Sequence, residues 1–464
     1  MNVGERKETM EKPNVILISA DQMRVHEMGC YGGEAPPGKP NTPNIDRLAS
    51  SGIRMDKAFS PNPVCTPARS CIMSGQYGKS CIGTVHNAAE PSSARNVFPE
   101  KTLAELLKGE GYDTALIGKW HIHAAPEKLG FDDCAYPKFN HLNRNQDYNI
   151  NGERHIIDGC AYEFELERAR EYIGKKRDRP FFLYHSISLP HMPFFDVADE
   201  FKYRYAKSET PLRQNVKPGI NGAFDQMWFR IYMYDYLYYR YLGDRHTVMP
   251  DGFGIDELYA MYRGMIYAAD FQVGKIMEYV ENAGLAESTV IAFVSDHGDN
   301  MGSHGLYNKD CSYEEAIRVP FVVSHPGHIK PASDLDNVAS LIDVAPTILD
   351  LCGIDIPGYI QGVSLAPLFG GNGKLGRDKI FIECSNGELV CRTNRYKLSV
   401  LAEYSKGGKS KVVDKFHRFA DLGSDPYEMS EPDGSADYGC MKEELFAAVM
   451  EWDEQTKWME EIRQ

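Results

Sequence analysis

The sequence predicts an α/β fold with a mostly parallel central sheet flanked by helices. Short apolar runs rich in β-branched residues, such as NVILISA at 14–20 and STVIAFV at 288–294, are typical of strands buried on both faces of a sheet. Longer amphipathic stretches lie between such runs, as at 256–285. This alternation of strands and helices indicates parallel strands joined by crossover helices.

Each element has its own signal in the sequence. The amphipathic stretch EKTLAELLKGEGY at 100–112 predicts a helix that ends at Gly109 and Gly111, and DTALIGKWH follows it as a strand. RPFFLYHSISLPH at 179–191 predicts a buried strand with polar residues at its carboxyl end. The remaining predictions are strands at 288–299 and 319–327 and helices at 256–285 and 340–354.

The pattern changes at about residue 375. Residues 1–374 are predicted to form one large domain, and 375–464 a smaller α+β subdomain with a small antiparallel sheet and a terminal helix. An insertion at about 200–255 contains the stretch MWFRIYMYDYLYYRYLG, whose tyrosines follow neither the strand period nor the helix period. We expect this insertion to serve packing or a subunit contact; a lid that stacks on a sugar or an aryl group is the alternative.

The chain is acidic, with 51 lysines and arginines against 66 aspartates and glutamates and a net charge of −15. This charge argues against nucleic acid or an anionic membrane as the main partner. No run approaches the roughly 18 apolar residues of a membrane span, and the charged N-terminus lacks the apolar core of a signal peptide. Eleven cysteines without regular spacing fit a reducing compartment, so we expect a cytoplasmic protein.

Four of the predicted strands end in polar residues that can take part in chemistry. These residues are Asp21 and Gln22, Lys119 and His121, His191, and Asp296 and His297. Ligand sites of open α/β sheets lie at the carboxyl ends of the strands. We therefore expect residues that are far apart in the sequence to meet at one edge of the sheet.

Part of this set suits a divalent cation. Asp21, Asp296 and His297 offer oxygen and nitrogen ligands, and Gln22 is a candidate fourth. An oxygen-dominated set favours Ca²⁺ or Mg²⁺ over an ion that prefers thiolates.

The other part suits a tetrahedral oxyanion. Arg69, Lys119 and Lys309 supply positive charges that can neutralise negative charge developing in a transition state. His121 and His191 can each move a proton near neutral pH.

Cys65 can supply the nucleophile that these two groups lack. It lies in SPNPVCTPARSCIMSG at 60–75, a turn-prone segment just before a stretch that can begin a helix, and Arg69 follows four positions later. A cysteine that serves only packing would lie within an apolar periodic run.

The stretch CTPAR resembles the sulfatase signature C-x-P-x-R, in which the cysteine is oxidised to formylglycine after translation. Further blocks resemble the same family in the family's order, among them PNVILISADQMR, GYDTALIGKWHIH, SLPHMPF, SDHGDNMGSHGLYNKDCSYEEAIRVPFVV and FADLGSDPYEM. The blocks spread over most of the chain, with 140–180 and 200–255 outside them. The chain thus resembles the formylglycine-dependent sulfuric ester hydrolases of the alkaline-phosphatase-like superfamily.

The resemblance implies hydrolysis of a small-molecule or saccharide sulfate ester to inorganic sulfate and an alcohol. Formylglycine made from Cys65 would attack the sulfur as its hydrate, and Arg69 would hold this group in place. A maturation enzyme that makes formylglycine is an implied partner. The ligands of one Ca²⁺, or of Mg²⁺ or Mn²⁺, would be Asp21, Gln22, Asp296, His297 and the oxidised Cys65.

The resemblance also implies roles for the lysines and histidines. Lys119 and Lys309 would bind the sulfate oxygens. His191 would assist the leaving alcohol. His121 would take a proton from the second hydroxyl of the hydrate, which expels sulfate and restores the aldehyde.

Several alternatives stay open. Many family members carry paired aspartates where this chain has Asp21 and Gln22, and the Asp-Gln and Asp-His pairing also occurs in relatives that resemble phosphonate monoester hydrolases and choline sulfatases. A phosphonate or phosphate ester hydrolase is therefore one alternative, and an unmodified, non-catalytic binder of sulfated ligands is another. A dinuclear-zinc phosphatase is disfavoured, because it needs Ser or Thr as nucleophile and more His and Asp ligands. The oligomeric state, including a homo-oligomer, also stays open.

Overall fold

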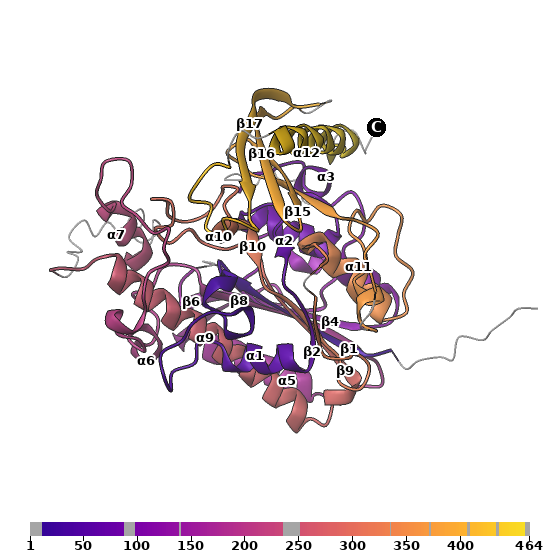
Figure 1. Cartoon of the computed structure of the whole chain (residues 1–464). Helices are drawn as coiled ribbons and strands as arrows, with labels where there is room; N and C mark the ends of the chain where they lie inside the picture. The colour runs from indigo at the N-terminus through magenta and orange to yellow at the C-terminus, as the bar shows by residue number, and fades with distance from the viewer. Residues whose placement is uncertain are drawn as a thin grey trace, which may run out of the picture.

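A large sheet lies between two layers of helices, and a smaller sheet with the last helix packs on one side of these layers (Figure 1). The structure is a computed structural model, and it describes residues 12–87, 98–138, 141–234, 251–334, 336–370, 373–405, 409–432 and 436–459. None of the helices in these ranges is long and apolar enough to cross a membrane.

The large sheet has ten strands among the described residues. Their order is β12 (Ala332–Asp334), β2 (Gly52–Met55), β11 (Phe321–Ser324), β9 (Thr289–Ser295), β1 (Asn14–Asp21), β8 (Phe181–Pro190), β4 (Asp113–Gly118), β5 (Asp133–Pro137), β6 (Arg144–Ile150) and β7 (Glu153–Cys160). The central strands from β9 to β5 pair in parallel. Strands β11, β6 and β7 pair antiparallel with their neighbours. The predicted parallel core is therefore confirmed within a mixed sheet.

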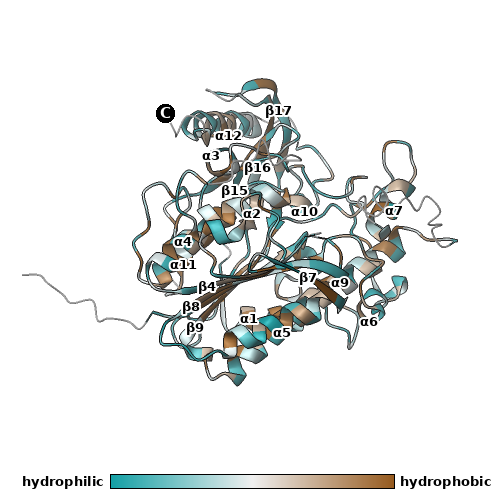
Figure 2. Ribbon diagram, turned by 180° about the vertical axis from the view of Figure 1, so that it is seen from behind, coloured by the Kyte–Doolittle hydropathy of each residue, from teal (hydrophilic) through white to brown (hydrophobic). Residues whose placement is uncertain are grey.

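Helices cover both faces of the sheet, as Figures 1 and 2 show from opposite sides. One face carries α1 (Pro43–Ser50), α5 (Ala161–Gly174) and α9 (Ile255–Asn282); the other carries α2 (Cys65–Ser74), α4 (Leu103–Gly109) and α11 (Val344–Leu351). Hydrophobic residues dominate the central strands, whereas α1 and α5 carry both hydrophobic and hydrophilic residues (Figure 2). The helices predicted at 100–112, 256–285 and 340–354 are present as α4, α9 and α11.

Strand β1 shows why the central strands are continuous apolar runs. Ile16 and Ile18 pack in the core on the α9 side, whereas Val15 and Leu17 pack in the core on the α4 and α11 side. Successive side chains of a strand point to opposite faces. Because both faces are covered, all four of these positions are apolar.

The strand predicted at 319–327 is present as β11, but it runs antiparallel to β9. The connection from β9 to β11 contains only one short α-helix, α10 (Glu314–Ile317). A parallel neighbour needs a crossover of a dozen or more residues, usually a helix that packs on the sheet, whereas an antiparallel return needs none. The predictions at 14–20, 113–121, 179–191 and 288–299 are confirmed as β1, β4, β8 and β9.

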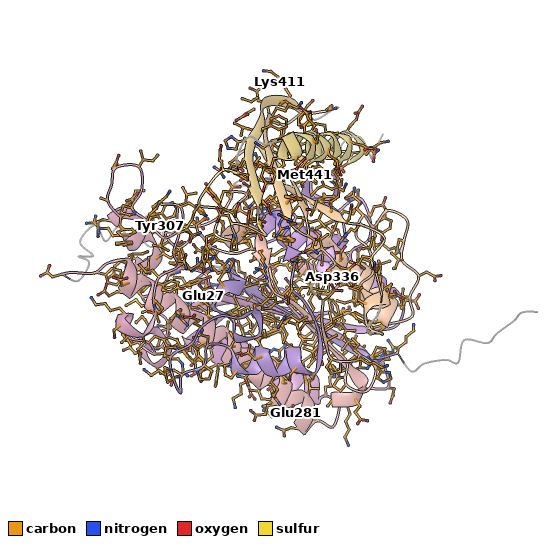
Figure 3. All side chains as sticks on the ribbon, in the orientation of Figure 1. Glu27, Glu281, Tyr307, Asp336, Lys411 and Met441 are labelled. Atoms are coloured by element: carbon orange, nitrogen blue, oxygen red, sulfur yellow. The ribbon has the colours of Figure 1, made fainter. Side chains whose placement is uncertain are left out.

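The C-terminal subdomain has the predicted antiparallel sheet and terminal helix. Its strands are β14 (Lys379–Glu383), β15 (Glu388–Thr393), β16 (Tyr396–Glu403) and β17 (Lys411–Asp421), in that order, and α12 (Ala436–Gln455) packs on them. Lys411 and Met441, labelled in Figure 3, mark the sheet and the helix. A three-stranded sheet of β10 (Arg318–Val319), β3 (Ala58–Phe59) and β13 (Ala339–Ser340) completes the sheets in the described ranges. The boundary between residues 374 and 375 stays a prediction.

The predicted insertion at about 200–255 is described in part. Helix α7 (Gln226–Tyr234) lies within it, and Phe229 and Tyr232 are buried in the same core as α9. These two side chains serve packing. The rest of the tyrosine-rich stretch, from residue 235 onward, lies outside the described residues.

A buried ion pair joins helix α12 to the short helix α3 (Gly78–Cys81), which follows α2. The Lys79 ammonium lies 2.8 Å from a carboxylate oxygen of Asp453, and neither side chain is more than 1% exposed. The same ammonium lies 4.3 Å from the centre of the Trp452 ring. Loss of either charged partner would leave the other charge buried and unpaired.

We therefore expect Asp453→Ala to lower the free energy of unfolding by about 3 to 5 kcal/mol, measured by denaturant titration with circular dichroism. The matched control is Lys415→Ala on strand β17, which removes an exposed ion pair with Glu443 of α12. That change should cost less than about 1 kcal/mol. Similar losses in the two variants would contradict the assignment of the buried pair.

Candidate active site

Four parallel strands bring their polar ends to one edge of the large sheet, as predicted. β9, β1, β8 and β4 are neighbours in that order, and they end at Ser295, Asp21, Pro190 and Gly118. The predicted site residues of these strands lie at these ends or directly after them.

The backbone is tightly packed where the strands end. Gly118 has a φ of +98°, and a Cβ on it would lie 2.2 Å from the carbonyl oxygen of Ser186. A Cβ on Gly298 would lie 1.9 Å from a carbonyl oxygen of α10. Gln22 and His121 adopt φ values of +66° and +54°, which non-glycine residues rarely do. Such conformations cluster at functional sites, where the surrounding structure enforces them.

Cys65 is the first residue of α2 and is buried among charged groups. Its Sγ lies 3.2 Å from Lys309 Nζ, 3.2 Å from His297 Nε2 and 3.8 Å from Asp21 Oδ1. Burial alone would raise the pKa of the thiol, but Lys119, Lys309 and His297 lower it well below its usual range. Negative charge is therefore favoured at this position.

Four side chains form a set that can hold a divalent cation. The ligand atoms of Asp21, Cys65, Asp296 and His297 lie within 4.8 Å of one another. His297 Nδ1 donates a hydrogen bond to the Gly298 carbonyl oxygen over 3.0 Å, so its Nε2 is the nitrogen that faces the carboxylates. That Nε2 lies 3.6 Å from one oxygen of each aspartate.

The two aspartates create strongly negative surroundings. Burial raises the pKa of Asp296, and the neighbouring Asp21 raises it further. Burial also favours the neutral form of Asp21, but Lys119, His191 and Arg69 lower the pKa of Asp21 below its usual value. For His297, burial lowers the pKa and Asp296 raises it, with a net rise. Positive charge is therefore favoured between these groups.

Arg69 holds both aspartates by its buried guanidinium. Its Nε donates to Asp296 Oδ2 over 2.9 Å, and its Nη2 lies 3.7 Å from Asp21 Oδ2. Its Nη1 donates to Ser186 Oγ over 2.6 Å. Burial would lower the pKa of Arg69, but Asp296 and Asp21 raise it above its usual value.

The predicted lysines approach Cys65 and Asp21. Lys309 Nζ lies 3.2 Å from Cys65 Sγ, and Lys119 Nζ contacts Asp21 Oδ2. Burial would lower the pKa of Lys309, but Cys65 and Asp21 raise it. Both ammonium groups are thus available to an anion bound next to residue 65.

Gln22 makes hydrogen bonds with both ends of its side-chain amide. Its Oε1 accepts from Lys309 Nζ over 2.9 Å, and its Nε2 donates to Asn308 Oδ1 over 3.2 Å and also to Asp299. The amide oxygen has a second lone pair. Its role as a cation ligand stays a prediction.

Three histidines face the same place. His191 Nδ1 donates to the Met192 carbonyl oxygen over 2.6 Å, and His121 interacts with the Cys65 thiol. The third, His141, stacks on His191 with ring centres 3.9 Å apart. Burial lowers the pKa of His121, His141 and His191, the last to about 4.

The structure brings all the predicted site residues together, but sequence reasoning missed His141 and Ser186. His141 lies in a stretch with no recognisable motif or period, so no signal pointed to it. Ser186 lies in the predicted strand at 179–191, and its polar side chain near the carboxyl end of the strand is the signal that could have identified it.

Comparisons with known proteins agree with this geometry. A family model described as sulfatase matches residues 13–354, and one described as the C-terminal region of N-sulphoglucosamine sulphohydrolase matches 302–455. N-acetylglucosamine-6-O-sulfatase of Bacteroides thetaiotaomicron is 26% identical and covers 97% of this chain and 88% of its own length.

Two solved structures have the same fold. One, in complex with its substrate D-glucosamine-2-N,6-O-disulfate, has a TM-score of 0.77 and 24% identity and covers 95% of this chain and 97% of its own. The other is the phosphonate monoester hydrolase of Agrobacterium radiobacter, with a TM-score of 0.68 and 21% identity over 96% of this chain and 97% of its own. Because the family model spans most of the chain, the protein belongs to the sulfatase family, whose members hydrolyse sulfate esters.

Proposed function

We propose that this protein hydrolyses a sulfate monoester by means of a formylglycine made from Cys65 and one divalent cation, and releases inorganic sulfate and an alcohol. One observation carries this proposal. The Cys65 side chain lies between two opposite kinds of group, with the aspartates and His297 on the cation side and the ammonium of Lys309 at 3.2 Å.

The residues present fit a hard divalent cation. Asp21 and Asp296 supply carboxylate oxygens and His297 an imidazole nitrogen, all within 4.8 Å of Cys65 Sγ and of one another. An oxygen-rich set of this kind favours Ca²⁺, Mg²⁺ or Mn²⁺. When bound, the cation would supply Lewis-acid stabilisation of negative charge next to residue 65.

The surroundings of Cys65 also fit formylglycine. Lys309, His297 and His121 offer polar contacts to an oxygen at this position. As its hydrate, formylglycine would supply the hydroxyl nucleophile that a sulfate ester requires. A maturation enzyme would act on Cys65 beforehand.

The remaining side chains would bind the substrate and move protons. Lys119 and Lys309 would bind sulfate oxygens, since their ammonium groups lie next to Asp21 and Cys65. The negative charge of a bound sulfate ester would raise the pKa of His191, so that its Nε2 can donate a proton to the leaving oxygen. His121 would take a proton at the side chain of residue 65. Arg69 would hold the aspartates in place.

A sulfated saccharide is the substrate class that we favour. A hollow of about 500 Å³ lies beside His121, and its lining includes Trp120, Tyr136 and Arg154. Aromatic rings and a guanidinium are groups that commonly contact sugars and anionic substituents. The relative named N-acetylglucosamine-6-O-sulfatase supports this choice.

A phosphonate or phosphate ester hydrolase with the same side chains is the second candidate. Gln22 gives the cation site one fewer negative charge than an aspartate pair would give. The fold shared with a phosphonate monoester hydrolase is compatible with this alternative. A non-catalytic binder is less favoured, because simple binding does not need His121 and His191.

Mass spectrometry tests the modification. We expect the tryptic peptide 58–69, which contains Cys65, to be lighter than its sequence mass by about 18 Da, since a thiol becomes an aldehyde. The neighbouring peptide 70–79, which contains Cys71, should keep its unmodified mass. Full turnover by protein whose peptide 58–69 is unmodified, or by Cys65→Ala, would show that another nucleophile acts.

Kinetics with two substrates test whether the enzyme acts on a sulfur or a phosphorus centre. We expect kcat/KM for p-nitrophenyl sulfate to exceed that for p-nitrophenyl phenylphosphonate, because the proposed enzyme transfers a sulfuryl group. The two substrates share a leaving group, so the ratio reports the sulfur or phosphorus centre. A preference for the phosphonate by orders of magnitude would favour the second candidate.

Calcium titration tests the cation site. After dialysis against a chelator, we expect a lower melting temperature and lost activity, both restored by Ca²⁺, Mg²⁺ or Mn²⁺. Asp296→Asn removes the charge of one ligand. It should therefore raise the Ca²⁺ concentration at the midpoint of the melting-temperature titration at least about tenfold. Asp270→Asn changes a buried carboxylate that contacts the start of α1, and it should leave the midpoint unchanged. Equal midpoints in the two variants would contradict the assigned ligands.

A further inference from the structure

His141 contacts three side chains to which the proposed function assigns roles. Its Nδ1 lies 3.3 Å from Lys119 Nζ. Its ring stacks on the ring of His191, with centres 3.9 Å apart and planes inclined by 19°. The centres of the His141 and His121 rings lie 5.3 Å apart, with planes inclined by 81°. His141 therefore lies against Lys119, His191 and His121.

In the hydrogen bond between His141 and Lys119, only the lysine can be the donor. An ammonium group has three donors and no acceptor, so His141 Nδ1 must accept. Asp21 Oδ2 accepts a second hydrogen of the same ammonium. With two hydrogens directed by fixed acceptors, the third points to one place, where a sulfate oxygen can bind.

The stacking constrains His191. Its Nδ1 donates to the Met192 carbonyl oxygen over 2.6 Å, which orients one edge of the ring. The ring of His141 covers one face of it. A hydrogen bond at one edge and a stacked ring on one face together oppose rotation of the imidazole, so Nε2 stays directed at the site.

Asp21, His141 and His191 also have ligand atoms within 4.8 Å of one another, which raises the question of a second metal ion. The lone pairs of imidazole nitrogens lie in the ring planes. Because the rings of His141 and His191 are stacked and nearly parallel, their lone pairs cannot converge on one ion at the usual length of about 2.0 to 2.1 Å. The arrangement therefore suits positioning and does not suit metal binding.

We propose that His141 is a positioning residue that orients the ammonium of Lys119 for sulfate binding and the ring of His191 for proton donation to the leaving oxygen. This inference rests on the proposed function. It assigns two separable contributions to one side chain: an acceptor atom for Lys119 and a flat surface for His191.

Two variants separate the contributions. His141→Phe keeps an aromatic ring over His191 and removes the acceptor. His141→Asn keeps an acceptor near the place of Nδ1 and removes the ring. The matched control is His328→Phe, which changes a second stacked histidine pair of the described residues: the ring centres of His325 and His328 lie 4.1 Å apart, with planes inclined by 22°.

The first measurement is calorimetric binding of inorganic sulfate, which needs no turnover. We expect His141→Phe to weaken sulfate binding about tenfold or more, since a hydrogen bond to a charged group is lost. His141→Asn should restore most of this affinity. Wild-type affinity in both variants, or equal losses in both, would overturn the Lys119 part of the inference.

The second measurement is kcat for a series of phenyl sulfates with leaving phenols of different pKa. Poor leaving groups need a proton more than good ones, so a misplaced His191 should make the dependence of log kcat on leaving-group pKa steeper. We expect the steeper slope in His141→Asn and a nearly unchanged slope in His141→Phe. A uniform loss across the series in both variants would show a merely structural role and overturn the His191 part.

The outcomes for the inference and for the proposed function are distinguishable. If the wild-type protein turns over no sulfate ester, including saccharide sulfates, the proposed function fails, and the sulfate titrations still decide whether His141 orients Lys119. If the wild-type protein is active and both His141 variants match it and His328→Phe in binding and slope, the inference fails and the function stands.

Discussion

The structure of the site depends on two carboxylates buried side by side. Asp21 and Asp296 are buried away from water, where like charges repel strongly and a charge without a partner is costly. The buried guanidinium of Arg69 offsets this repulsion by holding both. Lys119 then pairs with Asp21. Each positive group that is placed to balance the aspartates also lies next to Cys65, so charge balance in the interior produces a place where an anion can bind.

Much of the fold could be predicted because the central strands carry a simple signal. In β1, the positions from Val15 to Ile18 are all apolar since both faces are buried, and this pattern is readable without a structure. The pairing direction of β11 was not readable, because it depends on the chain that precedes the strand. Strands β6 and β7 also escaped prediction. Most side chains of β6 are polar, and β7 (Glu153–Cys160) is largely exposed, so neither strand gives an apolar period. What the sequence determines locally was predicted, and what tertiary contacts determine was missed.

The candidate site, too, could be predicted only where its residues carry a local signal in the sequence. Asp21, Lys119, His191 and Asp296 were found because each lies at or just past the end of an apolar run, where a parallel sheet places its functional groups. The resemblance then supplied chemistry for Cys65. His141 has no such marker. It lies just before a polar strand, and only the packed structure brings its ring onto His191. Residues that act through their neighbours leave little trace in a single sequence, since their position depends on contacts that are distant along the chain.

The depth at which α2 lies limits when its first residue can be chemically altered. All ten residues of this helix are buried, and Cys71 within it belongs to the same hydrophobic core as Leu389 and Leu398 of the C-terminal sheet. The proposed maturation enzyme would have to bind the segment around Cys65, and in the folded state this segment is already part of the buried helix. Access is simplest while the polypeptide is still emerging from the ribosome, before the C-terminal sheet packs against the helix. Because position 65 is synthesised well before the C-terminal sheet, the order of synthesis provides such an interval.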